Sequence, residues 1–368
     1  MHADRLAACQ QRLADSPADA AVFAPGANLT YLTGFETEAS ERALFLFVTS
    51  DAVEFFVPEL VEEQVAASTP IDQIRTWRDD ETPHKPLSAL CADLGLAGDD
   101  TRLLIDETMW ARFTHLLRDV FPQATVGLAT ELMAELRIRK GDTELAALRR
   151  AAAAADTAMM RLRDRGDDLV GLTESAVATR IETELADAGG ESLSFEPIVA
   201  AGPHGARPHH THGDREIRAG EPVVLDFGCR IDGYPSDQTR TVVFGGEPSA
   251  RFTQGHEIVR RAQRAAIERV EPGVTAGDVD EAARSVIEQA GYGEQFMHRT
   301  GHGVGLAVHE EPEISAGNNR RLEPGMVFSV EPGVYCSGEF GVRIEDLVVV
   351  TETGCERLNT TPRGWQCE

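Results

Sequence analysis

Residues 296–312 read Phe-Met-His-Arg-Thr-Gly-His-Gly-Val-Gly-Leu-Ala-Val-His-Glu-Glu-Pro. The stretch holds three of the chain's eleven histidines, His298, His302 and His309, with three glycines among them. Glycine lets a backbone bend tightly and approach an ion or a substrate closely. Neutral imidazole is the commonest metal ligand and a proton shuttle near pH 7. The stretch therefore indicates either a site of chemistry or a polar surface loop, and matching ligands from other segments would decide between them.

The length and composition of the chain exclude several classes of protein. Its 368 residues are too many for one ordinary core and predict two domains. A content of 42% hydrophobic and 26% charged residues is typical of a folded chain. No apolar run approaches a membrane span and the start lacks a secretory signal, so we expect a cytoplasmic protein. The six scattered cysteines form no Cys-x-x-Cys pair and predict reduced thiols.

The charge of the chain is strongly acidic. The formal net charge is -26 at pH 7, and Lys85 and Lys140 are the only lysines. Such a field repels phosphate backbones and anionic lipids, which argues against nucleic-acid and membrane partners. A lysine-poor acidic surface also fits a protein that works in concentrated salt, where screening relieves self-repulsion. We therefore expect a halophilic type of surface, and full stability in dilute buffer would count against it.

The first part of the chain, residues 1–136, has the pattern of a mixed α/β domain. Short apolar runs predict strands and amphipathic stretches predict helices. The expected strands lie at residues 21–23, 43–48, 53–57 and 103–105, and the expected helices at residues 60–67 and 110–121. His84 and His115 are isolated and predict no site. Strong helix formers from 132 to 163, interrupted at Gly141, lead into a second domain that we assign to residues 137–368.

The second domain contains an internal repeat. Residues 171–177 (Gly-Leu-Thr-Glu-Ser-Ala-Val) match residues 273–279 (Gly-Val-Thr-Ala-Gly-Asp-Val). In each copy a Thr can cap a helix, an amphipathic helix follows, and a Gly ends it. Capped amphipathic helices can resemble one another by chance. However, each copy also follows another helix and precedes strands, and chance would not explain this shared order. The repeat predicts one pseudo-symmetric α+β domain built from two halves.

The segment after the first copy contains two apolar runs on either side of Asp232-Gly233, a strong signal for a β-hairpin. A turn centred there pairs Asp226 with Thr239 and puts Asp237 diagonally beside Asp226 on the same face. An Asp in a run such as Val-Val-Leu-Asp-Phe is costly to bury unless it is paired or bound to a metal.

The segment after the second copy predicts a second hairpin, centred near Gly338. Its symmetry places Glu331 and Glu345 directly opposite each other. Like charges in this position destabilise a sheet, and cations between them would remove the conflict.

Salt bridges are an alternative to metal binding for the four acids, because Arg230, Arg240 or Arg343 could pair with them. The four acids are Asp226, Asp237, Glu331 and Glu345. Buried carboxylates beside one another cannot all ionise without strong positive charge nearby. Four carboxylates and the imidazole of His302 would instead balance two divalent ions with a bridging hydroxide. Oxygen-rich ligation with one nitrogen suits manganese, cobalt, iron or zinc. Asp232 and Asp346 are expected to be a turn residue and a solvated neighbour rather than ligands.

Together these motifs resemble those of the pita-bread metallopeptidases, a family that includes Xaa-Pro dipeptidase (prolidase), aminopeptidase P, methionine aminopeptidase and creatinase. The matching features are the Asp226–Asp237 spacing, Thr-Gly-His-Gly-Val-Gly-Leu-x-x-His, Val-Glu-Pro-Gly and Arg-Ile-Glu-Asp. The resemblance covers residues 194–350, and Asn-Leu-Thr-Tyr-Leu-Thr-Gly-Phe at 28–35 resembles the start of the family's extra N-terminal domain. It implies an α+β pita-bread catalytic domain preceded by a smaller α/β domain, and often a homodimer.

The resemblance also implies roles for individual residues. Asp226 would bind one ion, Asp237 and Glu345 would bridge two ions, manganese or cobalt above all, and His302 and Glu331 would complete the second. A bridging hydroxide would attack the scissile carbonyl, with Glu331 as the proton shuttle. The remaining site residues implied are His309 as the electrophilic partner, His298 in the wall, His209 as the Pro-His histidine, and Arg343 on a substrate or metal-ligand carboxylate. A one-residue slip from His209 to His210 stays open, and His204, His210 and His212 are otherwise expected to be loop residues.

The implied substrate is a small peptide with proline after the scissile bond. The sequence does not decide between a dipeptidase and an aminopeptidase. The compact catalytic half favours a prolidase. Two rivals belong to other classes. One is creatinase-like hydrolysis without metal, and the other is a non-catalytic binding module. The complete set of ligands argues against both.

Overall fold

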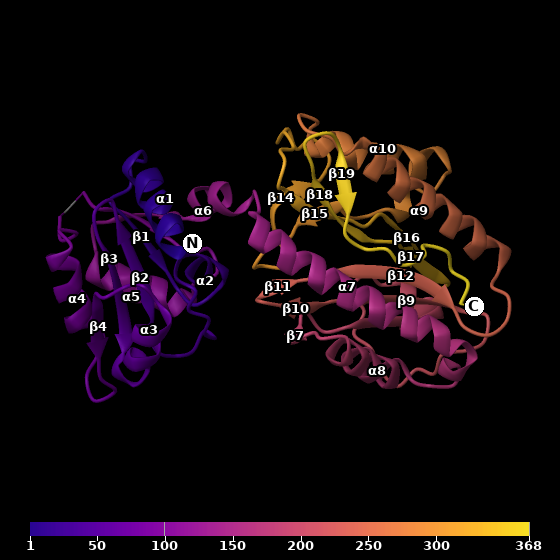
Figure 1. The fold of residues 1–368 in the computed structure, drawn as a ribbon, viewed down its shortest axis with the longest axis horizontal. Helices are drawn as coiled ribbons and strands as arrows, with labels where there is room; N and C mark the ends of the chain where they lie inside the picture. Colours follow the sequence, from indigo (N-terminus) through magenta and orange to yellow (C-terminus); the bar gives the residue numbers. More distant parts are fainter. Residues whose placement is uncertain (99, 368) are drawn as a thin grey trace. The chain divides into compact units, whose positions relative to one another are not determined.

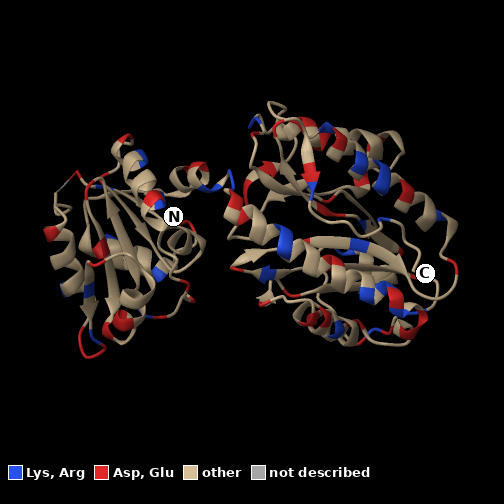
Figure 2. Cartoon of the chain, viewed as in Figure 1, with Lys and Arg blue, Asp and Glu red and all other residues tan. Residues whose placement is uncertain are grey.

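The computed structural model describes residues 1–98 and 100–367. The chain divides into two compact units, Met1–Arg137 and Ile138–Glu368. None of the described helices combines the length and the apolarity that crossing a lipid bilayer requires. Figure 2 shows that acidic residues recur along the helices and connecting loops of both units.

The first unit is a six-stranded sheet with helices, ordered β4-β3-β2-β1-β5-β6. Its strands are β1 (Ala20–Phe23), β2 (Phe45–Thr49), β3 (Val53–Pro58), β4 (Ile74–Trp77), β5 (Arg102–Ile105) and β6 (Thr125–Leu128). Its helices are α1 (His2–Ala14), α2 (Ala27–Thr33), α3 (Glu62–Ser68), α4 (His84–Asp93), α5 (Ala111–Val120) and α6 (Thr130–Arg137). This confirms the mixed α/β prediction. The sequence missed β4 and β6 because they are edge strands that are only partly buried.

The described residues of the second unit, 138–367, form four long helices. They are α7 (Asp142–Arg165), α8 (Glu174–Asp187), α9 (Ala250–Arg269) and α10 (Ala276–Gln289). Figure 1 shows α9 and α10 together on one side of the unit and α8 on the other, with strands between them. One core cluster joins α9 and α10 to nearby strands through Phe252, Ile287 and Phe328, and another joins α7 and α8 to strands through Met159, Ile181 and Leu225. Each half therefore has a core cluster, and a further cluster joins Leu148 of α7 and Tyr234 to Val327 and Leu347 of the second half.

The strands of this unit form four sheets, ordered β11-β10-β7, β12-β9-β8, β14-β13-β15-β18-β19 and β16-β17. In the first half they are β7 (Ser192–Leu193), β8 (Ile198–Ala201), β9 (Pro222–Phe227), β10 (Cys229–Ile231), β11 (Tyr234–Pro235) and β12 (Gln238–Val243). In the second half they are β13 (Gly301–Gly303), β14 (Glu310–Ile314), β15 (Val327–Val330), β16 (Gly333–Cys336), β17 (Phe340–Arg343), β18 (Asp346–Val350) and β19 (Cys355–Arg357).

The two repeat copies adopt the same local structure. Gly171 and Gly273 both have a φ of 87°, a left-handed conformation that glycine tolerates. Two residues later, Thr173 and Thr275 cap α8 and α10, each accepting a hydrogen bond from a backbone amide of the first turn at 3.1 Å. These caps confirm the repeat as a structural one.

Burial of His256 predicts that the stability of the second unit depends on pH. This residue of α9 is 3% exposed, and burial lowers its pKa from 6.5 to about 4. As the pH falls below 6.5, the unfolded chain binds a proton that the folded protein does not, so the folded state loses stability until the pH reaches about 4. The loss from this group amounts to about 2 kcal/mol at pH 5.

The variant His256→Gln, which has no such proton to bind, tests this expectation. We expect the unfolding free energy of wild type to fall by about 2 kcal/mol more than that of the variant between pH 7 and pH 5. Urea unfolding at both pH values measures the difference. A difference that does not change with pH would contradict the assignment.

Candidate active site

The first predicted hairpin is present in the expected register. Asp232 and Gly233 have φ values of 51° and 77° and form its turn, and Asp226 pairs with Thr239. The ladder is interrupted before the turn, where β9 and β12 give way to β10 and β11 in a separate sheet. Asp226 and Asp237 both point into one cavity.

The second hairpin also has the predicted centre, because Cys336 pairs with Phe340 around Gly338. Its register continues in β15 and β18, but Glu331 and Glu345, which were predicted to lie directly opposite each other, fall in the gap between the two ladders. The ladder breaks at Glu331 and Glu345, so these two do not form a strand pair. Their backbone amides donate to other segments instead, Glu331 to the carbonyl of Thr300 at 2.8 Å and Glu345 to that of Thr239 at 3.1 Å. The break joins the glutamates to both halves of the domain.

His302 lies on β13 between two glycines that the packing requires. A Cβ on Gly301 would stand 1.9 Å from the carbonyl oxygen of Ser329, and one on Gly303 would stand 2.2 Å from that of Glu311. The Nδ1 atom of His302 lies 3.1 Å from the carbonyl oxygen of Gly303. A proton on Nδ1 donates to that carbonyl and leaves Nε2 free to bind a metal.

A cavity of about 550 Å³ brings all nine predicted site residues together. Donor atoms of Asp237, His302 and Glu345 lie within 4.8 Å of one another. The Nε2 atom of His302 is 3.3 Å from a carboxylate oxygen of Glu331 and 3.7 Å from one of Asp237. The nine residues in its wall are His209, Asp226, Asp237, His298, His302, His309, Glu331, Arg343 and Glu345.

The carboxylates of this cavity are poorly compensated by the protein alone. Burial, followed by the charges of neighbouring carboxylates, raises the pKa of Asp237 and Glu345 well above their usual range. Burial also raises the pKa of Glu331. One oxygen of Asp226 is buried without a hydrogen-bond partner. These carboxylates therefore fit bound cations, which would supply the missing positive charge and the missing partner.

Three imidazoles of the cavity, those of His298, His302 and His309, are neutral at pH 7. Burial lowers the pKa of His302 and of His309 to about 4 and also lowers that of His298. The rings of His302 and His309 are 4.1 Å apart between centroids. Neutral rings can bind a metal ion or donate a hydrogen bond to a substrate without adding charge.

Arg343 is 4% exposed and its guanidinium is committed to the protein. It pairs with the carboxylate of Asp226 and donates to the Tyr335 hydroxyl at 2.9 Å and to the Thr239 hydroxyl at 3.1 Å. Arg343 was expected to hold either a substrate carboxylate or the carboxylate of a metal ligand. The structure shows it on the carboxylate of Asp226, a candidate metal ligand.

The loop before β9 places His209, and not His210, in the cavity wall. His210 turns away and its Nε2 lies 2.9 Å from a carboxylate oxygen of Glu174. His204 and His210 lie in this loop and outside the cavity lining, as expected, but both also contact this fully buried glutamate. His212 lies 3.0 Å from the Ser175 hydroxyl.

Comparison with known proteins agrees with this site. Residues 146–352 match the model of metallopeptidase family M24, and residues 5–139 match the creatinase/prolidase N-terminal domain. The chain belongs to metallopeptidase family M24. This confirms both the predicted family and the pita-bread fold class.

Relatives of this M24 metallopeptidase match it over nearly their whole length. The chain is 41% identical to a probable dipeptidase PepE of Mycobacterium tuberculosis, covering 98% of this chain and 95% of the relative. It is 36% identical to a Xaa-Pro dipeptidase of Lactobacillus delbrueckii, with 99% and 98% covered. The crystal structure of a prolidase from Thermococcus sibiricus matches with a TM-score of 0.94 at 38% identity, covering 100% of this chain and 99% of the other.

Tyr335 is a residue of the M24 site that the sequence did not single out. Its hydroxyl accepts from Arg343 and lies 2.9 Å from Nε2 of His298, so it joins two predicted site residues. Its place in the hairpin after Glu331, on the face of Arg343, is the signal that could have found it.

We expect Tyr335→Phe to lower kcat/KM for peptide hydrolysis by about 10-fold to 100-fold without loss of metal, because the ring of His298 and the guanidinium of Arg343 lose their shared partner. Steady-state kinetics and metal analysis measure both quantities. The matched control is Tyr234→Phe, which removes a buried hydroxyl bonded to Glu144 at 2.7 Å outside the cavity. Equal losses in the two variants would contradict a role at the site.

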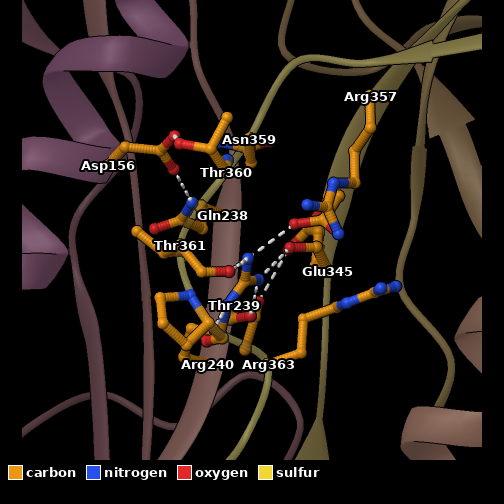
Figure 3. A network of polar contacts seen from close by, with 12 residues as sticks. Asp156, Gln238, Thr239, Arg240, Glu345, Arg357, Asn359, Thr360, Thr361 and Arg363 are labelled. Carbon is orange, nitrogen blue, oxygen red and sulfur yellow. Dashed lines mark hydrogen bonds and ion pairs between the residues drawn. The ribbon is translucent and has the colours of Figure 1, made fainter.

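Behind the cavity wall the M24 domain contains a buried polar network (Figure 3). Arg240 is 1% exposed and donates to the carboxylate of Asp346 at 2.6 Å. It also donates to the backbone carbonyls of Glu345, Thr361 and Pro362. The expectation that Asp346 is a solvated neighbour is therefore wrong. It is fully buried, because the carboxyl end of the described chain covers it and Arg240 compensates its charge.

Proposed function

We propose that this M24 metallopeptidase is a Xaa-Pro dipeptidase that works with two divalent metal ions. The observation that carries the proposal is the single cavity that gathers the carboxylates of Asp226, Asp237, Glu331 and Glu345 with four imidazoles and the buried Arg343. Support for the substrate class comes from similar proteins named as a Xaa-Pro dipeptidase and a prolidase, which match this chain from end to end.

The ligands proposed for the ions are five. Asp226 would hold one ion and Asp237 and Glu345 would contact both, while His302 and Glu331 would complete the second. The unpartnered oxygen of Asp226, and the Nε2 atom of His302 that faces the carboxylates of Glu331 and Asp237, support these residues as ligands. Manganese or cobalt suits this mixture of oxygen ligands and one nitrogen best, and zinc or iron is also compatible with it. Two such ions would supply Lewis-acid activation of a water and of the scissile carbonyl.

The remaining residues would handle protons and substrate. Glu331 would take up a proton and pass it to the leaving nitrogen. His309, which is neutral, would donate a hydrogen bond to the oxygen on which negative charge develops, and His298 would shape the same wall of the cavity. His209 would contact the substrate from the opposite half, and Arg343 would hold Asp226 in place.

Hydrolysis of three matched peptides tests the proposal. Ala-Pro, Ala-Pro-Ala and Ala-Ala are incubated with the enzyme and manganese or cobalt, and the products are measured. We expect cleavage of Ala-Pro only. Release of Ala from Ala-Pro-Ala would make the enzyme an aminopeptidase instead. Failure on all three peptides, with hydrolysis of creatine or with no hydrolysis at all, would favour the two rival functions.

We also propose that the acidic chain works best in concentrated salt and forms a homodimer. The net charge of -26 supports the first point, because added salt screens repulsion among surface carboxylates. Running the same assay and a sedimentation measurement at low and high salt tests both points. Full activity and stability in dilute buffer would count against salt adaptation, and a monomer at both salt concentrations would exclude the dimer.

A further inference from the structure

The first turn of α8 contains a carboxylate, that of Glu174, which no step of the proposed reaction uses. Glu174 is fully buried and directly follows the capping Thr173. The second repeat copy has Ala276 at the matching place, so capping the helix does not require an acid there. The partners of Glu174 lie 27 to 39 residues away, in residues 202–213 and at Ala201 just before them. We call residues 202–213 the His209 loop.

Glu174 binds this loop at both ends and near its middle. One carboxylate oxygen accepts from the backbone amide of Ala201 at 2.8 Å, and the other accepts from that of Gly213 at 3.2 Å. Between these points, the carboxylate bonds Nδ1 of His204 at 2.9 Å and Nε2 of His210 at 2.9 Å. Burial opposes ionisation of Glu174, but the amide of Ala201 and the two imidazoles outweigh it and lower its pKa. An ionised carboxylate makes these hydrogen bonds strong.

Both sequence neighbours of His209 are fixed by this arrangement. His210 is held by Glu174, and the carbonyl of Pro208 accepts from Arg343 at 3.4 Å on the cavity side. The loop also packs tightly on β17, since a Cβ on Gly341 would stand 1.8 Å from the carbonyl oxygen of Gly205. With its neighbours anchored on opposite sides, the backbone of His209 has little freedom to turn its ring out of the cavity.

The other half of the domain contains a similar device. Asp280 of α10 is fully buried and accepts from the backbone amide of Thr300 at 3.0 Å and from its hydroxyl at 2.8 Å. Thr300 lies two residues before His302. In each half, a buried carboxylate on the capped helix thus holds the segment that carries a histidine of the cavity.

We infer that Glu174 is a positioning residue that acts through His209, by holding the His209 loop so that this imidazole stays in the cavity. The inference rests on the proposed function, in which His209 contacts the substrate. Glu174, His204 and His210 also have the composition of a metal site. However, both carboxylate oxygens already accept backbone amides, and the imidazole nitrogens lie at hydrogen-bond distance, which favours a clamp made by the protein alone.

A double-mutant cycle between Glu174→Gln and His209→Ala tests the inference. Glutamine keeps the shape of the side chain but places a donor where the loop also presents donors. We expect Glu174→Gln to lower kcat/KM for Ala-Pro by about 10-fold to 100-fold with metal content unchanged. In the His209→Ala background the same change should lower kcat/KM by less than about 3-fold, because its target is gone.

The matched control is Glu184→Gln on the same helix. Glu184 is 6% exposed and pairs with Arg161 and Arg165 at 3.2 and 3.3 Å, outside the cavity lining. We expect this variant to lower the melting temperature to an extent similar to Glu174→Gln and to leave kcat/KM within about 3-fold of wild type. Equal losses of activity in the two variants would overturn the inference, as would full additivity with His209→Ala.

Hydrogen exchange of the metal-loaded protein tests the clamp without relying on activity. We expect amides of the His209 loop to exchange at least about 10-fold faster in Glu174→Gln and at the wild-type rate in Glu184→Gln. Unchanged exchange in the loop would overturn the clamp, and so would a third metal ion in wild type that Glu174→Gln loses. Unchanged activity in His209→Ala, with faster loop exchange in Glu174→Gln, would instead overturn the proposed role of His209.

Discussion

Asp237→Ala should lower kcat/KM for Ala-Pro by a factor on the order of 10³ or more and remove bound metal. Asp237 shares the cavity with Asp226, Glu331 and Glu345, and its donor atom lies within 4.8 Å of donors from His302 and Glu345. In the proposed set of ligands Asp237 would contact both ions, so its loss would leave neither with a full set. We expect the same outcome for His302→Ala. Steady-state kinetics and metal analysis of each variant measure the two effects.

The control for this prediction is His84→Ala. His84 begins α4 in the first unit, and its half-exposed side chain lies 3.6 Å from a carboxylate oxygen of Asp119. We expect kcat/KM to remain within about 2-fold of wild type, as for most surface substitutions. Comparable activity in Asp237→Ala, His302→Ala and His84→Ala would refute the assigned site.

Removal of metal should reverse the order of stability between wild type and Asp237→Ala. Burial and the neighbouring carboxylates raise the pKa of Asp237 well above its usual range, so its ionised form destabilises the metal-free fold at pH 7. Without metal, we therefore expect the variant to melt at a higher temperature than wild type. With manganese or cobalt, wild type should be the more stable of the two, because only wild type binds the ions tightly. Thermal melts with and without chelator measure both differences, and a variant less stable than wild type without metal would contradict this balance of charges.

The second large effect should follow from breaking the buried pair of Arg240 and Asp346. Arg240→Met leaves the fully buried carboxylate of Asp346 without its principal counter-charge, and removing one partner of such a pair costs about 3–5 kcal/mol of unfolding free energy. Figure 3 shows the same arginine, which lies beside Thr239 on β12, reaching the segment of Thr361. We therefore expect reduced activity as well, because the carbonyl of Glu345 loses a donor.

The double variant Arg240→Met/Asp346→Leu separates charge from packing. With no charge left uncompensated, we expect it to recover at least about half of the stability lost in the single variant. The exposed pair Arg149–Glu356, with 45% and 41% of the side chains accessible, is the control, and Arg149→Ala should cost about 1 kcal/mol or less. Urea unfolding measures all four proteins. A single variant as stable as wild type would contradict the importance of the buried pair.

Local signals in the sequence predicted much of the site. Asp232-Gly233 defines a hairpin turn through the backbone preferences of two adjacent residues, and that turn determines the pairing of Asp226 with Thr239. The centre of the second hairpin at Gly338 follows from the same kind of signal. Because side chains alternate along a strand, the register also put Asp237 on the same face as Asp226. The roles of His209, His298, His309 and Arg343 were indicated only by the resemblance to the pita-bread family.

Features that depend on distant segments were not predictable in this way. The ladder breaks at Glu331 and Glu345 because carbonyls of Thr300 and Thr239 take their amides, and neither partner is visible from the hairpin itself. Asp346 was expected to be solvated because its counter-charge is not visible in the nearby sequence. The counter-charge is Arg240, which lies more than a hundred residues earlier. The cluster of Glu174 with His204 and His210 was missed for the same reason, since its members approach only after the loop has folded back onto α8.

The most direct test of a two-metal dipeptidase is a titration of the metal-free enzyme with manganese or cobalt, followed by metal content and Ala-Pro hydrolysis together. We expect about two ions per chain at saturation, consistent with five ligands shared between two ions, and activity that is absent without metal and rises as the ions bind. Full hydrolysis of Ala-Pro by enzyme from which chelator has removed all metal would contradict the account. So would an enzyme that binds no ion when manganese or cobalt is in excess.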